Sequence, residues 1–348
     1  MCIVWANTKH LRNTKQIILI LSAGKLRSKT ITMEINKVYN IDFLNNDLPD
    51  KCAKLIIADP PYYKVKGDFD FIWKTFDDYL ADVEKWAVEC KRVLADNGTL
   101  LWYGDSKNIA YSQIILDKHF NLLSNITCHI YDRQTNKITI DDARSFINTS
   151  ERVLMYSNET YNLTQCVFLI RDYIREEIIK AKGKIVLKDV NIALGTATNG
   201  GGVASACLSL DKAEPIMLTK EMYVKLQKWC NPFLSKEYED LRKEYEDLRR
   251  PFNPIEQYKM DVLRVSQEGH ITGKYDHDTV KPEKLTRIFI TTCTNENDLV
   301  IIPFAGSGTE CAMSVKEKRN FIGFEITEKH ATMSNERVYT YLTAPTMF

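Results

Sequence analysis

Short apolar runs of strand length recur along the chain, separated by more polar segments. Each run is almost continuously apolar, which is typical of strands that are buried on both faces of a parallel sheet. The stretch that begins at Met33 reads as the start of a first strand that precedes them. The runs are Lys54–Ala58, Thr99–Tyr103, Arg152–Tyr156, Leu299–Phe304 and Phe321–Ile326.

Stretches with helical patterning lie between these apolar runs. They are Thr75–Asp96, Ile109–Lys118, Pro282–Thr292, Glu310–Lys318 and Thr327–Tyr341. Strands that alternate with helices build a sheet that carries helices on both of its faces. The pattern therefore predicts an α/β fold with a doubly wound, mostly parallel sheet.

The alternation stops between about residues 165 and 258. This part of the chain shows helical patterning and a glycine-rich loop but no buried-strand pattern, so we predict an inserted helical subdomain. Within it, Lys236–Arg242 (KEYEDLR) is repeated identically as Lys243–Arg249, and its Tyr and Leu residues form one apolar stripe on a charged helix. Two heptads are too few for a coiled coil. We interpret the repeat as a solvated helix that packs on a neighbour.

Two short helical stretches in the same region allow two interpretations. Leu187–Gly195 ends at a glycine, and Gly202–Ser209 follows it after a glycine-rich loop. The pair resembles a helix-turn-helix, whose second helix enters the major groove of DNA. The loop is longer than usual, however, and the second helix has no Arg or Gln to read base edges. A helical pair that only packs together is therefore the alternative.

Composition is that of an ordinary soluble globular protein, and only the distribution of charge adds to the picture. The formal net charge is +1, but residues 1–32 hold six Lys or Arg and no acidic residue, which leaves −5 for the remainder. We expect residues 1–32 to be a basic, disordered extension outside the folded domain. The alternatives are a basic arm that touches nucleic acid and a targeting peptide. No apolar run approaches the roughly 20 residues of a membrane helix.

Nine cysteines are scattered along the chain. They form no CxxC pair and no cluster with the spacing of zinc ligands. We expect buried, reduced thiols and no metal site.

The tetrapeptide Asp59-Pro60-Pro61-Tyr62 directly follows the first apolar run, where an open α/β sheet binds its ligands. Its chemistry suits the methylation of an amine on a nucleic-acid base. The Asp59 carboxylate and the Pro60 carbonyl can each accept an amino hydrogen bond, which stabilises positive charge on a weakly nucleophilic nitrogen. The consecutive prolines restrict the backbone. Tyr62 offers a face on which an extruded base can stack. The alternative is a rigid turn capped by Asp59.

A second motif, PFAGSGT, follows the expected strand that ends at Ile302 and opens a helix. Small residues allow a ligand to approach the backbone, and the helix N-terminus offers free N–H groups. A further strand ends at Glu325, 17 residues after Gly308, so that this acid is a candidate for the ribose hydroxyls of an adenosine cofactor. No Lys follows Gly308, which argues against a Walker-type phosphate loop. The cofactor candidates in the loop are Phe304, Ala305, Gly306, Ser307, Gly308 and Thr309.

Together the two motifs resemble those of the DNA amino-methyltransferases of restriction–modification systems and phages. That family uses an FxGxG loop for S-adenosylmethionine and a DPPY tetrapeptide for the target amine. DPPY comes first here, which resembles the circularly permuted β-type arrangement. The segment His277–Leu285 is similar to the family's HPTxKPxxL and makes Thr279 and Lys281 candidates for the cofactor pocket. Tyr39–Leu44 resembles its opening motif, which places Asp42 near the adenine end of the cofactor.

Two positions depart from the family pattern. Ile302 stands where Asp commonly precedes the Pro of PFxGSG, and Asp278 replaces the Pro after the His. If the usual Asp helps to hold the methionine end of the cofactor, another group must replace it, and Glu310 is a nearby candidate. Because Ile302 replaces this Asp, a non-enzymatic DNA-binding protein with a degenerate cofactor pocket is the alternative.

The resemblance implies a Rossmann-like methyltransferase that uses S-adenosylmethionine, requires no metal, and methylates adenine N6 of a flipped base in duplex DNA. Asp59 favours adenine, while cytosine N4, RNA or protein are alternative targets. The expected domains are the extension 1–32, a catalytic half 33–160, a target-recognition insertion 161–260 and a cofactor half 261–348. A cognate restriction endonuclease, and either a monomer or a homodimer, are compatible with this interpretation. We expect the protein in the cytoplasm, or in the nucleus of a eukaryotic host.

Overall fold

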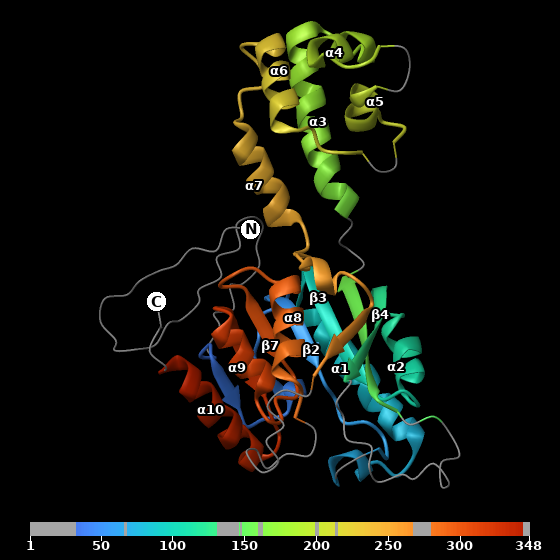
Figure 1. The fold of residues 1–348 in the computed structure, drawn as a ribbon, viewed down its shortest axis with the longest axis vertical. Helices are drawn as coiled ribbons and strands as arrows, with labels where there is room; N and C mark the ends of the chain where they lie inside the picture. The colour runs from blue at the N-terminus through green and yellow to red at the C-terminus, as the bar shows by residue number, and fades with distance from the viewer. Residues whose placement is uncertain are drawn as a thin grey trace. The chain divides into compact units, whose positions relative to one another are not determined.

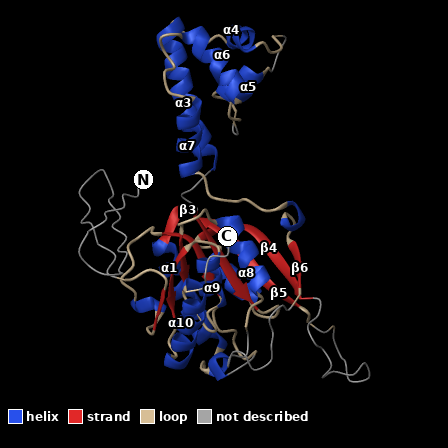
Figure 2. Cartoon of the chain, turned by 60° about the vertical axis from the view of Figure 1, so that its left-hand side comes forward, coloured by secondary structure: helices blue, strands red, loops and turns tan. Residues whose placement is uncertain are grey.

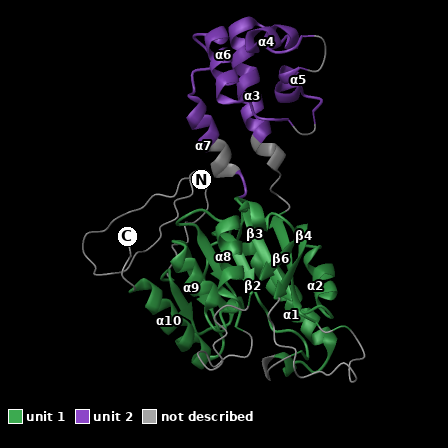
Figure 3. Cartoon of the chain, in the orientation of Figure 1, with its two compact units in different colours: residues 1–159, 251–348 green, residues 160–250 purple. Residues whose placement is uncertain are grey.

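The computed structural model describes residues 33–65, 68–130, 146, 148–158, 163–198, 202–212, 215–266 and 280–343. The described chain divides into two compact units (Figure 3). Unit 1 lies within residues 1–159 and 251–348, and unit 2 is residues 160–250. The expected extension, residues 1–32, lies outside the described residues.

Unit 1 is built on an eight-stranded sheet with the order β1-β8-β7-β2-β3-β5-β4-β6 (Figure 1). The strands β1, β8, β7, β2 and β3 run parallel to one another, β5 is antiparallel to β3 and β4, and β6 is parallel to β4. The strands are β1 Lys37–Tyr39, β2 Ala53–Ala58, β3 Leu94–Gly104, β4 Phe120–Ile130, β5 Ser150–Asn158, β6 Val262–Val265, β7 Leu299–Ile302 and β8 Asn320–Phe324. The expected doubly wound, mostly parallel sheet is confirmed.

Helices cover both faces of this sheet (Figure 2). Neighbouring residues of one strand point to opposite faces, so that Ile56 packs in one core and Ile57 in the other. This is why the central strands read as continuous apolar runs. The helices α1 Phe76–Val93 and α2 Ile109–Leu116 contribute to the first core, and α8 Glu283–Cys293, α9 Thr309–Lys316 and α10 Glu328–Leu342 contribute to the second. The described residues of unit 1 also form three short 3₁₀ helices: η1 Phe43–Asn45, η2 Asp68–Phe71 and η3 Glu256–Tyr258.

The regular elements in the described residues of unit 2 are helices, as the sequence pattern predicts. Its core includes Ile170, Ile174 and Ile178, which recur every four residues along one face of α3. In the repeated KEYEDLR segment, Leu241 is buried in the same core. The helices are α3 Leu163–Lys182, α4 Leu187–Leu194, α5 Val203–Leu208, α6 Lys220–Cys230 and α7 Tyr238–Leu248.

The pair α4 and α5 is joined through a buried side chain. The Asn191 amide oxygen accepts hydrogen bonds from Thr196 Oγ1 and from the backbone N–H of Ala204, both at 2.9 Å. The second helix has only six residues, and Ala204, Cys207 and Leu208 are buried. These contacts favour a pair that packs together, and a role of α5 in the major groove stays a prediction.

The structure places the second boundary of the insertion at residue 250 instead of 260. Residues 251–266 return to unit 1, because β6 pairs with β4 from Thr127↔Val262 to Ile130↔Val265. Strands β4 and β6 were not predicted from the sequence. Both strands alternate buried with more exposed positions and so lack a continuous apolar run.

Candidate active site

The two sequence motifs meet at one edge of the sheet. Strands β2 and β7 are parallel neighbours, with Leu55 paired to Val300 and Ile56 to Ile301. Asp59 follows β2 and the PFAGSGT loop follows β7, so both lie beyond the carboxyl ends of adjacent strands. This edge is where open α/β sheets bind their ligands.

A cavity of about 720 Å³ lies at this edge. Its volume suits a cofactor-sized ligand, for which sites of roughly 300–1,000 Å³ are typical. Gly308 and Thr309 do not line it. Thr279 lies outside the described residues, together with the neighbouring His277 and Asp278. The predicted residues that line the cavity are Asp42, Asp59, Pro60, Pro61, Tyr62, Lys281, Phe304, Ala305, Gly306, Ser307 and Glu325.

Asp59 is held by two partners inside the cavity. The Tyr62 hydroxyl donates a hydrogen bond to Asp59 Oδ1, and Lys281 Nζ lies 3.1 Å from Asp59 Oδ2. Burial raises the pKa of Asp59 above its ordinary value, and the Lys281 charge opposes this rise. Burial and the Asp59 charge raise the pKa of the Tyr62 hydroxyl well above its ordinary value, so Tyr62 stays a donor. The sequence predicted a stacking face for Tyr62 but not this hydrogen bond.

The buried carboxylate of Asp70 holds the backbone of the Asp59–Tyr62 tetrapeptide. Asp70 is only 1% exposed, and its Oδ1 accepts a hydrogen bond from the Tyr62 backbone N–H. The Asp70 carbonyl accepts a second bond from the Lys64 N–H at 2.7 Å. Asp70 therefore adds to the restraint that the two prolines impose. Nothing in the sequence around Asp70 indicated this role.

Lys281 is the cation at the centre of the site. Besides Asp59, its Nζ lies 3.3 Å from Glu151 Oε2 and 3.3 Å from the Tyr62 hydroxyl, and it lies 4.9 Å from the centre of the Tyr103 ring. Burial alone would lower the pKa of Lys281, but the charges of Asp59 and Glu151 outweigh it and raise that pKa. Lys281 was predicted as a cofactor-pocket residue, and its pairing with two carboxylates was not foreseen.

Glu325, which the sequence predicts to accept hydrogen bonds from the cofactor ribose, holds the glycine loop in place. Glu325 Oε2 accepts a hydrogen bond from the Gly306 N–H, and its Oε1 accepts one from the Thr327 N–H, both at 2.9 Å. On the other side of the loop, Ser334 Oγ donates to the Gly306 carbonyl at 2.7 Å. Glu325 therefore shapes the loop as well as lining the cavity, and its contact with ribose stays a prediction.

Gly308 and Thr309 support the loop without lining the cavity. Gly308 has a φ of 74°, and a Cβ atom there would lie 2.8 Å from the Cα of Ser334 on α10. Only glycine fits both the left-handed conformation and this close approach. The Arg337 guanidinium donates to the Ser307 carbonyl at 3.1 Å and to Thr309 Oγ1 at 2.8 Å. These two residues thus join α9 and the loop to α10.

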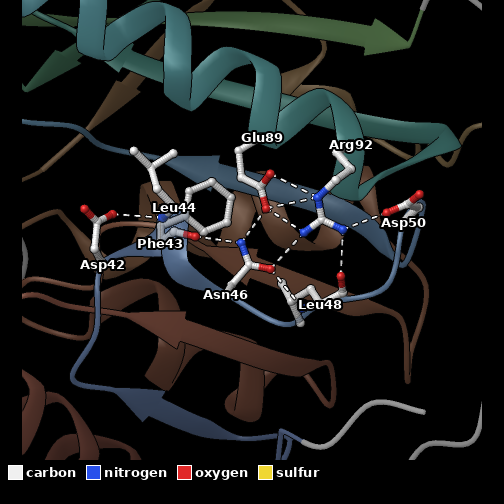
Figure 4. Close-up of polar contacts among 8 residues, drawn as sticks. All are labelled: Asp42, Phe43, Leu44, Asn46, Leu48, Asp50, Glu89 and Arg92. Atoms are coloured by element: carbon white, nitrogen blue, oxygen red, sulfur yellow. Dashed lines mark hydrogen bonds and ion pairs between the residues drawn. The ribbon is translucent and has the colours of Figure 1, made fainter. Parts of the chain in front are cut away.

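Asp42 reaches the cavity from a segment that is tied to α1 (Figure 4). Asp42 Oδ1 accepts a hydrogen bond from the Leu44 N–H at 2.8 Å and so caps η1. Further along, Arg92 on α1 donates to Asn46 Oδ1 at 3.0 Å and to the Leu48 carbonyl at 2.7 Å, while Glu89 lies 2.6 Å from the guanidinium. This network fixes the segment against α1. The residues of this network are far apart in the sequence, so no local sequence pattern predicted their contacts.

At the end of β7, the structure places an apolar side chain where the family resemblance anticipated a carboxylate. Ile302 is 1% exposed and packs in the second core of unit 1. Glu310, on the first turn of α9, is 5% exposed and lines the cavity. Burial, reinforced by the Asp59 charge, raises the pKa of Glu310 to about 7.

Comparison with known proteins identifies the family to which this site belongs. A family model described as DNA methylase, of the N6/N4 methyltransferases, matches residues 53–336. The chain belongs to this family. Its members are S-adenosylmethionine-dependent DNA amino-methyltransferases, as the order of the two motifs had suggested. The match begins at β2 and ends in α10, so it includes both halves of the site and the insertion between them.

Individual relatives are distant. The methylase is 24% identical to the DNA adenine methyltransferase YhdJ of Escherichia coli over 84% of this chain and 78% of YhdJ. It is 38% identical to the orphan methyltransferase M.BamHII of Bacillus amyloliquefaciens, in a match that spans only 20% of this chain and 26% of that protein. A crystal structure of the M1.HpyAVI–SAM complex is 18% identical, with a TM-score of 0.47, over 86% of this chain and 98% of that one.

The residues of the methylase site fit S-adenosylmethionine. The cavity combines the glycine loop, at the start of α9, with a carboxylate oxygen, Glu310 Oε1, that is buried and has no hydrogen-bond partner among the described residues. Such an oxygen suits a cationic ligand. Within the same described residues, no group of three or more His, Cys, Asp or Glu is placed to hold a metal ion. No helix that the structure describes has the length and apolar character needed to cross a membrane.

Proposed function

We propose that this methylase transfers the methyl group of S-adenosylmethionine to N6 of an adenine in duplex DNA. The observation that carries the proposal is the position of Asp59, which lines the cavity beside the glycine loop and is held by Tyr62 and Lys281. A carboxylate fixed in this way can receive an exocyclic amino group without the cost of reorganisation during the reaction.

The chain's own groups position the amine and stabilise its charge. Asp59 accepts one amino hydrogen bond and the Pro60 carbonyl accepts the other, so that the nitrogen lone pair points away from the base plane. Lys281 and the Tyr62 hydroxyl hold the Asp59 carboxylate in place, and Asp70 holds the Tyr62 backbone. S-Adenosylmethionine supplies the methyl group as an electrophile when bound.

Two observations favour adenine as the target. Asp occupies the first position of the tetrapeptide, and one relative that matches over most of both chains, YhdJ, is a DNA adenine methyltransferase. We propose further that unit 2 reads the DNA sequence around the target, because it is inserted in the chain between the two segments that form the site.

The test is expression of the full chain in a host that lacks adenine methylation, followed by sequencing of its genomic DNA with a method that reports modified bases. We expect N6-methyladenine in one short sequence context, and none with Asp59→Ala. Asp96→Ala is the matched control, because Asp96 forms an exposed ion pair with Lys51 at 2.7 Å and does not line the cavity. N4-methylcytosine would overturn the choice of base. A folded protein that binds S-adenosylmethionine but modifies no DNA would direct attention to RNA or protein.

A further inference from the structure

Glu310 is a buried carboxylate that the proposed transfer chemistry does not use. It is the second residue of α9 and follows the glycine loop directly. Its side chain lines the cavity although only 5% of the residue is exposed, and its Oε1 atom has no hydrogen-bond partner in the part of the chain that the structure describes. A buried, unmatched carboxylate oxygen costs free energy in the ligand-free protein. Such a cost is explained if a ligand provides the partner.

The other acidic groups around Glu310 already have partners. Asp59 and Glu151 both pair with Lys281, at 3.1 and 3.3 Å, and Glu325 accepts two backbone hydrogen bonds. Lys281 faces Asp59, Glu151 and Glu310 together. The other cation that acts on Glu310, Arg337, pairs with Glu283 at 2.9 Å, so the ionised site keeps an excess of negative charge. A positively charged group of a ligand beside Glu310 would balance this excess.

S-Adenosylmethionine carries such a charge in the right part of the molecule. The sulfur that bears the transferred methyl group must approach the amine held by Asp59, and the methionine portion with its α-ammonium group is attached to that sulfur. Asp59 and Glu310 lie close enough that the charge of Asp59 contributes to the raised pKa of Glu310. The methionine portion therefore belongs near Glu310, while Ile302 offers no polar atom there.

We propose that the Glu310 carboxylate binds the α-ammonium group of the cofactor. This assignment rests on the proposed function, since it requires S-adenosylmethionine as the ligand. Glu310 would then be the side chain that distinguishes ligands with an amino-acid end from ligands without one, whatever the charge on the sulfur.

The experiment measures dissociation constants by titration calorimetry at pH 8 for the full chain and for Glu310→Gln. Three ligands separate the possible contacts: S-adenosylmethionine, S-adenosylhomocysteine, which lacks the sulfonium charge, and 5′-methylthioadenosine, which also lacks the amino-acid end. We expect Glu310→Gln to weaken the first two by a similar factor of about tenfold to a hundredfold, as for a charge-assisted hydrogen bond, and to leave the third unchanged. Glu317→Gln, at the far end of α9 and paired with Arg287, is the control and should change none of them.

Three outcomes would overturn the assignment. If the affinity for all three ligands fell equally, Glu310 would support the loop and would not contact the amino-acid end. If only the affinity for S-adenosylmethionine fell, Glu310 would lie against the sulfonium. Unchanged binding of every ligand would leave Glu310 without a contact to the cofactor. Failure of the unsubstituted protein to bind S-adenosylmethionine would refute the proposed function itself, whereas normal binding with no effect of Glu310→Gln would refute only the inference.

Discussion

Replacement of Glu310 by Gln should make the ligand-free protein more stable, and the gain should depend on pH. Burial raises the pKa of Glu310 from an ordinary 4.5 to about 7. Because the folded state holds this proton more tightly than the unfolded state does, the contribution of Glu310 to stability is fully present below about pH 4.5. It is lost as the pH rises to about 7. Gln has the same shape and stays neutral, so it behaves like the protonated acid at every pH.

The size of the gain follows from the difference between the two pKa values. That difference is about 2.5, and each pKa unit corresponds to 1.36 kcal/mol, so the full effect is about 3 kcal/mol at pH 8. At pH 5 the folded state keeps Glu310 protonated, and the expected gain falls to about 1 kcal/mol. A gain of this size is large for a protein whose total stability is typically 5–15 kcal/mol.

Urea unfolding of both proteins at pH 5 and pH 8, without cofactor, measures the effect. Tryptophan fluorescence reports mainly on unit 1, because three of the five tryptophans, Trp73, Trp86 and Trp102, are buried in its first core. Glu317→Gln again serves as the control and should show no pH-dependent gain. The reasoning is refuted if Glu310→Gln changes the free energy of unfolding by the same amount at both pH values, or if it destabilises the protein at pH 8.

Two further substitutions test the structure of the site. Lys281→Met should destabilise the protein by about 3–5 kcal/mol in urea unfolding at pH 8, because it leaves Asp59 and Glu151 buried without their cation. Lys51→Met, which breaks an exposed ion pair, should cost less than about 1 kcal/mol, and similar losses for both would contradict the burial argument. Gly308→Ala should cost about 2–4 kcal/mol, from its positive φ and from contact with α10. At Gly183 φ is 77° but the surrounding space is open, so thermal unfolding of Gly183→Ala should show only the smaller cost of the backbone conformation. An equal loss of stability in both variants would mean that α10 shifts to accept the added Cβ atom at residue 308.

The sequence alone predicted those features that depend on local pattern. The central strands were found because both of their faces are buried, and Asp59 and the glycine loop were found because each follows such a strand. Strands β4 and β6 were missed because they alternate in burial. Contacts between distant segments were also missed. The hydrogen bond of Asp70 to the tetrapeptide backbone and the ion pair of Glu151 with Lys281 depend on how the chain folds and not on adjacent residues. Thr279 and the extension 1–32 lie outside the described residues and stay predictions.

The strand order of the sheet has a consequence for how the protein is made. Strands β7 and β8 lie between β1 and β2 in the sheet, although they come last in the chain. During synthesis, β1 and β2 therefore leave the ribosome long before β7 and β8 have been made. One edge of β2 stays unpaired until residues 299–302 are available. Such long-range pairing is slow, and an unpaired strand edge is prone to aggregation. A chain cut short before β7 should have no closed active site and should depend on chaperones to stay soluble.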